Sequence, residues 1–265
     1  MKNKNISVSD WELPEHQINE FGSKCSNYCL CIPIMNEGHK FKKQLAKLTP
    51  YKKLVDIIIL DWGSTDGSTN KTFLKKNGVR TLIIKESPGR QGTQFRMGFS
   101  YALKEGYDGI ITMDGNNKDG AEAIPYFIKS LKEGFDYIQG SRFVKDGKGI
   151  NTPLSRYLGI RFVLSPLLSL AANYWYTDIT NGYRAFSRNY LLHPKVKPFR
   201  DIFISYEMLF YLTVRANQIG LKTKEIPVVR EYPKGEIPTK IKGWKGNLHM
   251  ITTAIKVVTN YYHPS

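Results

Sequence analysis

Apolar, β-branched runs alternate with helix-forming stretches over residues 28–140, and this alternation limits the chain to a few folds. The clearest run, 55–60, is almost continuous in Val, Ile and Leu, which is typical of a parallel strand buried on both faces. Comparable runs occupy 28–34, 79–84 and 109–113. Strands that alternate with helices predict a parallel sheet with helices on both faces, so we expect an α/β fold.

The remaining elements follow from periodicity and from turn residues. We expect helices ending near Leu48 and Asn77, helices at 91–105 and 121–133, then a helical segment at 153–175 broken at Pro166, a short strand-like segment at 178–186, a helix at 204–218, a strand at 221–229 and a closing helix at 243–261. The chain then divides into an N-terminal extension (1–27), a first half (28–140) and a second half (141–265) of one domain. At 265 residues, one core is sufficient.

Net charge is the unusual part of the composition. The chain carries a formal charge of +16, and the segment from Thr180 to Ser265 contributes 14 Lys and Arg less 5 Asp and Glu, which is +9. Such an excess predicts a polyanionic partner, either nucleic acid, an anionic membrane face or a phosphorylated small molecule. Charge alone does not choose among them.

The cysteines and the apolar segments indicate a reduced, cytosolic protein. Cys25, Cys29 and Cys31 are odd in number and crowd around one predicted strand, which does not suit a disulfide framework. The N-terminus lacks the apolar core of a signal peptide. The long uncharged segment 162–176 is 15 residues, shorter than the roughly 20 that a membrane-spanning helix needs.

Polar groups gather where the run 110–113 ends. Asp114 is followed by Asn116 and Asp119, and these side chains could hold a hard cation and, through it, a diphosphate. Ligands of open α/β sheets bind at the carboxyl ends of strands, where Asp114 is expected. The alternative, an acidic turn that caps the next helix, is equally compatible with these residues taken alone.

Several motifs together resemble those of the inverting family 2 glycosyltransferases. They are Cys31-Ile-Pro-Ile-Met-Asn-Glu37, Ile59-Leu-Asp-Trp-Gly-Ser-Thr-Asp-Gly-Ser68 and Met113-Asp-Gly-Asn116. Within the family, Gly140-Ser-Arg-Phe143 and Asp178-Ile-Thr-Asn-Gly-Tyr-Arg184 are similar to motifs of dolichyl-phosphate mannose synthases and related polyprenyl-phosphate glycosyltransferases. Enzymes that build surface polysaccharides share the same pieces. The likeness covers nearly all of residues 28–230.

This resemblance implies a GT-A fold, a Rossmann-like and mostly parallel sheet flanked by helices, with a basic C-terminal helical portion. It makes the first half the binder of a nucleotide-diphosphate sugar and the second half the acceptor side. A divalent cation, Mn²⁺ or Mg²⁺, is implied on the diphosphate, with Asp114, Asn116 and Asp119 as its candidate ligands. Two departures affect that site, because Asn116 stands where relatives have an aspartate, and Lys118 adds a nearby ammonium.

The resemblance also assigns substrate contacts. It implies a nucleoside pocket at Pro33, Asn36 and Glu37, a base contact at Asp61, phosphate or base contacts at Arg90 and Arg96, and a loop carrying Lys240 that closes over bound donor. Glu37 could equally be a charge stabilised by a helix N-terminus. Trp62 replaces the second aspartate of the relatives, which affects the choice of base.

The role of the remaining candidate residues depends on the chemistry of the acceptor. A phosphate acceptor is already anionic and needs cations to position it, for which Arg142 and Arg184 are candidates. An alcohol acceptor needs a general base, for which Asp178 and Glu207 are candidates. Structural ion pairing is the alternative role for these residues. We expect a polyprenyl-phosphate or a lipid-linked or surface-glycan acceptor, with peripheral contact at the inner, anionic membrane face.

Three other functions compete with sugar transfer, and one is a non-catalytic sugar-nucleotide-binding protein, which would result if Asn116 and Lys118 abolish metal binding. A nucleotidyltransferase on a similar sheet is disfavoured, because the chain opens without a glycine-rich, basic phosphate loop. A nucleic-acid-binding protein would account for the charge, but the basic residues are not interleaved with aromatic residues in any RNA-binding motif.

Overall fold

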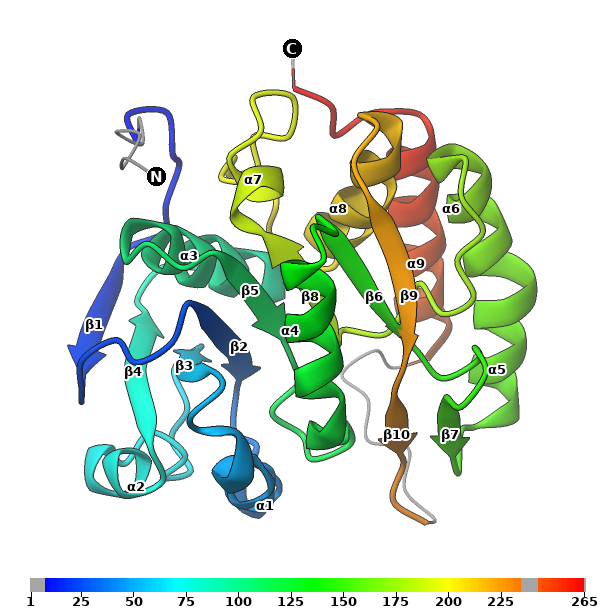
Figure 1. The fold of residues 1–265 in the computed structure, drawn as a ribbon. Coiled ribbons are helices and arrows are strands. Elements are labelled where there is room, and N and C mark those ends of the chain that lie inside the picture. Colours follow the sequence, from blue (N-terminus) through cyan, green and yellow to red (C-terminus); the bar gives the residue numbers. More distant parts are fainter. Residues whose placement is uncertain (1–7, 235–242, 265) are drawn as a thin grey trace.

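A mixed sheet of eight strands crosses the molecule in the computed structural model, which describes residues 8–234 and 243–264 (Figure 1). The order is β1-β4-β3-β2-β5-β8-β6-β9. The strands are β1 (His16–Glu20), β2 (Tyr28–Ile34), β3 (Asp56–Asp61), β4 (Val79–Lys85), β5 (Gly109–Thr112), β6 (Tyr137–Ser141), β8 (Arg184–Ser187) and β9 (Thr223–Pro227). A small parallel pair, β7 (Lys148–Ile150) and β10 (Val229–Glu231), lies apart from them.

Helices cover both faces of this sheet, as the alternating sequence predicts. They are α1 (Gly38–Leu48), α2 (Lys71–Lys76), α3 (Gln91–Lys104), α4 (Ile124–Lys132), α5 (Leu154–Gly159), α6 (Ser165–Ala172), α7 (Arg188–Leu191), α8 (Glu207–Gln218) and α9 (Gly243–Val258). Short 3-10 turns η1 (Thr49–Tyr51) and η2 (Ala121–Ala123) and the π-helical turn η3 (Ile160–Leu164) complete the elements.

The core has two layers because successive strand residues face opposite sides of the sheet. In β3, Ile58 and Leu60 pack with α3, α6, α8 and α9, whereas Ile57 and Ile59 pack with α1, α2 and α4. All six residues of β3 are buried, as expected for a strand covered on both faces.

The strand order creates a switch point between β2 and β5. From β2 the chain adds β3 and then β4 on one side, and it then returns to place β5 on the other side of β2. These four strands are parallel, so their carboxyl ends share one edge. Ligands of open α/β sheets bind outside that edge at the switch point.

The structure corrects several element predictions. His16–Glu20, placed in the extension, forms the edge strand β1, antiparallel to β4. The segment 178–186 is mostly turn, because the side chain of Asn181 accepts a hydrogen bond from the Tyr183 amide, and only Arg184–Ser187 is a strand. The strand β6 was not predicted, and it crosses the boundary drawn at residue 140. The predicted break at Pro166 is the π-helical turn η3, since proline has no N–H to continue the α-helical bonding.

The cysteines are free thiols, with Cys29 and Cys31 buried in β2 and Cys25 exposed. Within the described ranges, no helix combines the length and the apolar character needed to cross a bilayer.

Candidate active site

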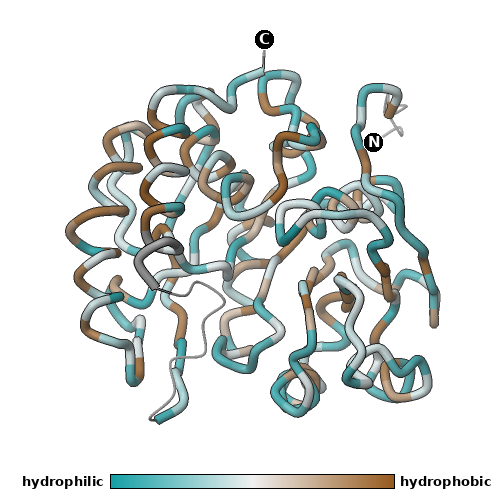
Figure 2. Tube along the Cα trace, turned by 180° about the vertical axis from the view of Figure 1, so that it is seen from behind, coloured by the Kyte–Doolittle hydropathy of each residue, from teal (hydrophilic) through white to brown (hydrophobic). Residues whose placement is uncertain are grey.

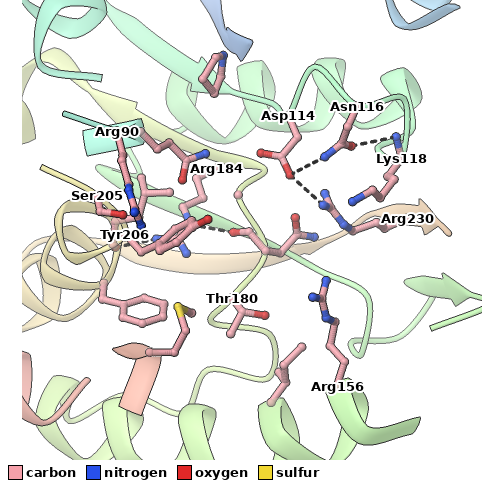
Figure 3. A pocket seen from close by; sticks show the side chains of 18 of the residues that line it. Arg90, Asp114, Asn116, Lys118, Arg156, Thr180, Arg184, Ser205, Tyr206 and Arg230 are labelled. Carbon is pink, nitrogen blue, oxygen red and sulfur yellow. Dashed lines mark hydrogen bonds and ion pairs between the residues drawn. The ribbon is translucent and has the colours of Figure 1, made fainter. Parts of the chain in front are cut away.

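A cavity of about 1020 Å³ opens at the switch point, outside the carboxyl ends of β2, β3 and β5. The first half contributes Pro33, Glu37, Trp62, Arg90 and Asp114, among others, and the second half contributes residues from α5 to α9. Figure 3 shows side chains of both halves converging on it. The cavity thus joins the two halves predicted from the sequence.

Asp114 is held by a cation from a distant part of the chain. Its Oδ2 accepts a hydrogen bond from Nη2 of Arg230 at 2.7 Å (Figure 3). Nη1 of the same arginine lies 2.5 and 2.6 Å from the two carboxylate oxygens of Asp119. The small sheet positions Arg230, because it belongs to β10. Burial alone would raise the pKa of Asp114, but Arg230 and Lys118 hold that pKa below its usual value.

Lys118 and Asn116 complete this charged end of the cavity. The Asn116 amide lies 3.4 Å from Asp114 Oδ2, and its oxygen accepts a hydrogen bond from the Lys118 backbone. Burial and the neighbouring Arg230 lower the pKa of the Lys118 ammonium. This end of the cavity therefore places the Asp114 carboxylate between two cations, Arg230 and Lys118.

The candidate metal ligands do not form an all-protein cage. The described part of the chain has no cluster of three or more His, Cys, Asp or Glu side chains suited to a metal. Asp119 is fully buried with both oxygens on Arg230, so it is not available as a ligand in this arrangement. Asp114 lines the cavity, and one carboxylate with substrate phosphates is a usual Mg²⁺ environment.

The nucleoside side is formed by the ends of β2 and β3. Pro33 and Glu37 line the cavity. Asn36 adopts the left-handed conformation (φ 52°), and its side chain accepts a hydrogen bond from the Thr65 amide at 2.8 Å, which fixes the turn after β3. Asp61 is 1% exposed, and while Oδ2 accepts from the Ser64 amide, Oδ1 has no partner in the described structure. A buried, unsatisfied carboxylate oxygen fits a hydrogen-bond donor from a ligand.

Arg90 and Arg96, both predicted to contact the nucleotide, lie in different environments in the structure. Arg90 lines the cavity and is exposed. Arg96 is 5% exposed, and it donates to the carbonyl of Glu12 on the N-terminal segment. Arg96 does not line the cavity, and its guanidinium is engaged on the N-terminal segment, which argues against a nucleotide contact by this residue. Its position in the sequence does not show which face of α3 meets the cavity. Lys240 lies outside the described residues.

The four candidate catalytic residues are engaged in structural bonds. Arg142 and Asp178 form a buried pair, with Nε to Oδ2 at 2.6 Å and Nη2 to Oδ1 at 2.7 Å. Arg184 is 1% exposed and donates to the carbonyls of Ile179, Asn181 and Leu209 and to the Thr213 hydroxyl. Glu207 accepts from the backbone amides of Ile204 and Ser205 before α8.

These bonds change the roles expected for the four residues. Both oxygens of the Asp178 carboxylate are paired with Arg142, and most of the N–H groups of Arg184 donate to backbone carbonyls. Glu207 lines a smaller neighbouring hollow rather than the main cavity. The ion pair weighed as the alternative role of Arg142 is present. Arg184 bonds instead to backbone carbonyls and a hydroxyl, and Glu207 to backbone amides, rather than to the opposite charges weighed as their alternatives.

Sequence reasoning missed several residues of the site, among them Arg230 on β10. Arg156 on α5, Tyr206 before α8 and Tyr232 after β10 all line the cavity (Figure 3 shows the first two). They come from elements far apart in the chain, so no local spacing marks them. The basic loop at 230–242 was the only sequence signal near Tyr232.

A mostly parallel sheet with a charged cavity at its switch point defines a single α/β domain of GT-A type. The chain belongs to glycosyltransferase family 2, because residues 29–193 match the family model described as glycosyl transferase family 2. It is therefore a glycosyltransferase, and the resemblance inferred from the motifs is confirmed.

Curated relatives of similar length support the assignment. The chain is 26% identical to an undecaprenyl-phosphate mannosyltransferase of Micrococcus luteus over 200 residues, which cover 74% of this chain and 80% of the relative. It is 26% identical to a polyprenol monophosphomannose synthase of Mycolicibacterium smegmatis over 204 residues, which cover 74% of each.

Solved structures share the fold. A glucosyl-3-phosphoglycerate synthase of Mycobacterium tuberculosis, crystallised with Mn²⁺, uridine diphosphate and glucosyl-3-phosphoglycerate, aligns with a TM-score of 0.61. The identity is 14%, and the alignment covers 88% of this chain and 78% of that one. A neighbour of the same fold therefore contains a divalent cation in its crystal structure.

Proposed function

We propose that this glycosyltransferase moves a sugar, with inversion, from a nucleotide-diphosphate sugar to the phosphate of a polyprenyl-phosphate. One observation carries the proposal, namely a single cavity with two unlike ends. Asp114, Lys118 and Arg230 form a charged end, and the other end is walled by apolar residues, which are Ile160, Val163, Leu164, Leu209, Phe210, Met250 and Ile251. A phosphorylated lipid has the same two-part chemistry. The names of the relatives in Micrococcus and Mycolicibacterium agree with it.

The donor belongs at the ends of β2, β3 and β5. Asp61 offers its unsatisfied oxygen to the base or ribose, and Pro33, Asn36 and Glu37 border the nucleoside. A divalent cation, Mn²⁺ or Mg²⁺, would be held by Asp114, with Asn116 beside it, and when bound it supplies positive charge to the diphosphate. Arg90 is placed to approach the same phosphates.

Transfer to a phosphate needs no general base in the protein. An acceptor phosphate oxygen attacks the anomeric carbon, the bond from that carbon to the diphosphate oxygen breaks, and its electron pair leaves with the nucleotide. Lys118 and Arg230 can stabilise the charge that develops on the leaving group. Arg156, at the second-half wall, can hold the acceptor phosphate by charge-assisted hydrogen bonds. The engaged carboxylates of Asp178 and Glu207 are consistent with this chemistry.

A paired-acceptor assay tests the proposal. Purified protein is given radiolabelled GDP- and UDP-sugars with a short polyprenyl-phosphate, with the same polyprenol lacking phosphate, or with an oligosaccharide. We expect label only in the phosphate-bearing lipid, because only that acceptor is already anionic. Label in the oligosaccharide would instead indicate a glycan hydroxyl as acceptor, and free sugar alone would indicate hydrolysis.

Donor binding gives a separate prediction. One member of a panel of UDP-, GDP-, CDP- and dTDP-sugars should raise the melting temperature, since a ligand that binds only the folded state stabilises it by about 2.7 kcal/mol at 100 times its Kd. The shift should grow when Mn²⁺ is added. Differential scanning fluorimetry measures it, and no shift with any nucleotide would contradict a sugar-nucleotide donor.

The apolar residues exposed on the helical layer support peripheral contact with a membrane as part of this proposal. We define an apolar ridge that comprises Leu154, Leu158, Phe162, Leu170, Trp175, Leu248, Ile251 and Ile255. Phe162 is 68% and Leu170 78% exposed. The ridge belongs to α5, η3 and α6 and to α9, which packs beside α6, and hydrophobic segments recur along these outer helices in Figure 2.

Charge favours an anionic bilayer as the surface that covers this ridge. Residues 147–177 and 243–258 contain no Asp or Glu, although they contain Arg156, Arg161 and Lys256. Apolar side chains with basic neighbours are typical of helices that lie in a membrane interface. The apolar wall of the cavity uses Ile160, Val163 and Ile251 from the same elements, so a lipid acceptor could enter directly from the bilayer.

Vesicle sedimentation tests this contact. We expect the double variant Phe162→Ser with Leu170→Ser to lower partitioning onto phosphatidylglycerol vesicles by at least about tenfold, because burying one large apolar side chain contributes roughly 1.5–3 kcal/mol. The control is Tyr126→Ser, since Tyr126 is 56% exposed on α4, on the opposite face of the sheet. Equal partitioning of the two variants would contradict the ridge as the contact.

A further inference from the structure

Tyr232 stands among four cationic side chains at the wall of the cavity. Its hydroxyl oxygen accepts hydrogen bonds from Nη1 of Arg142 at 3.2 Å and from Nη1 of Arg156 at 3.3 Å. Its ring centroid lies 5.2 Å from the Lys118 ammonium and 5.9 Å from the Arg230 guanidinium carbon. The phenol thus contacts cations both through its oxygen and through its ring face.

The ring is held in place by the backbone on both sides. The Tyr232 amide donates to the carbonyl of Ile150 at 3.0 Å, and its carbonyl accepts from the side chain of Asn151 at 3.1 Å. Both partners lie at the end of β7, which pairs with β10. Tyr232 lines the cavity and is only 2% exposed, so its side chain forms a buried, fixed part of the cavity wall.

The two arginines that meet at this hydroxyl come from different elements. Arg142 follows β6 and is fixed from behind by Asp178, whereas Arg156 extends from the first turns of α5. Two guanidinium groups repel each other, and a shared neutral acceptor offsets that repulsion while it sets their spacing. Phosphate is recognised by guanidinium groups held in such an arrangement.

We propose that Tyr232 is a positioning residue that holds Arg142 and Arg156 for the phosphate of the acceptor, an inference that rests on the proposed function. The phenol accepts from both arginines with its oxygen lone pairs and keeps its own proton. That proton can be donated to a phosphate oxygen between the arginines. Tyr232 therefore couples the buried Arg142–Asp178 pair to the acceptor side of the cavity.

The titration of the phenol is consistent with this role. Burial raises the pKa of Tyr232, but Arg230, Arg142 and Arg156 outweigh burial and lower that pKa to about 8. At pH 7 the hydroxyl is mostly protonated and can both accept and donate. Above pH 8 a phenolate would neutralise part of the cationic wall formed by Lys118, Arg142, Arg156 and Arg230, and phosphate binding should weaken.

The variant Tyr232→Phe removes the hydroxyl and keeps the ring. Calorimetry with farnesyl phosphate, a short soluble probe of the acceptor, should give affinity about tenfold lower than in the wild type, as expected for a lost hydrogen-bond link to charged groups. The Kd of the nucleotide diphosphate should stay within about twofold, because the variant keeps the ring that faces Lys118 and Arg230 and loses only the hydroxyl at Arg142 and Arg156. The decline of farnesyl phosphate binding above pH 8 should move to higher pH in the variant.

The control variant is Tyr126→Phe, a change of the same size on an exposed residue of α4. Its affinity for farnesyl phosphate should match that of the wild type. Unchanged farnesyl phosphate binding in Tyr232→Phe, or a loss confined to the nucleotide, overturns the positioning role. Wild-type protein that binds farnesyl phosphate without transferring sugar to any polyprenyl-phosphate would contradict the proposed function and leave the Tyr232 comparison valid.

Discussion

Asp114→Asn should lower turnover by about 10²- to 10³-fold, the usual cost of removing one electrostatic contact of a transition state. Asp114 is the carboxylate at the β5 end of the cavity, and its pKa is held low by Arg230 and Lys118, so it is ionised when the donor binds. An amide has the same shape without the charge. The cation-dependent part of donor affinity should therefore disappear with turnover, while the fold persists.

Steady-state kinetics and calorimetry with the nucleotide diphosphate, each with and without Mn²⁺, measure the two effects. The matched control is Asp108→Asn, because Asp108 is exposed at the amino end of the same strand, β5. The control should keep wild-type kinetics. Unchanged turnover in Asp114→Asn would place the reaction centre elsewhere in the molecule.

The second large effect concerns stability. Asp178→Ala should lower the free energy of unfolding by about 3–5 kcal/mol, because it leaves the Arg142 guanidinium buried without its counter-charge. Both oxygens of Asp178 contact Arg142, and neither residue is more than 3% exposed. For a chain of this size the melting temperature should fall by roughly 6–20 °C.

Thermal and denaturant unfolding measure this change. Asp201→Ala is the control, since Asp201 is exposed, and its melting temperature should remain near that of the wild type. A variant Asp178→Ala that melts like the wild type but transfers no sugar would restore the alternative role of Asp178 as a general base. That result would also favour a hydroxyl acceptor over a phosphate.

Much of the fold was predictable because its signals are local. The β-branched run before Asp61 and the apolar run before Asp114 predict buried parallel strands, and they are β3 and β5 within a residue or two at each end. Strand β1 was missed because His16–Glu20 is polar, and its pairing with β4 is what makes it a strand. A polar edge strand carries little hydrophobic periodicity.

The parallel strands β2 to β5, the helices between them and the carboxylates at the strand ends are predictable from the sequence, since hydrophobic periodicity and turn residues act over a few positions. Only the tertiary structure decided what each charge contacts. Arg230 meets Asp114 across 116 positions of sequence, and Arg142 meets Asp178 across 36. Such pairs depend on which elements the fold brings together, because the energy of a charge depends on its distance to other charges and to water. The same packing brings Arg142 and Arg156 to the hydroxyl of Tyr232.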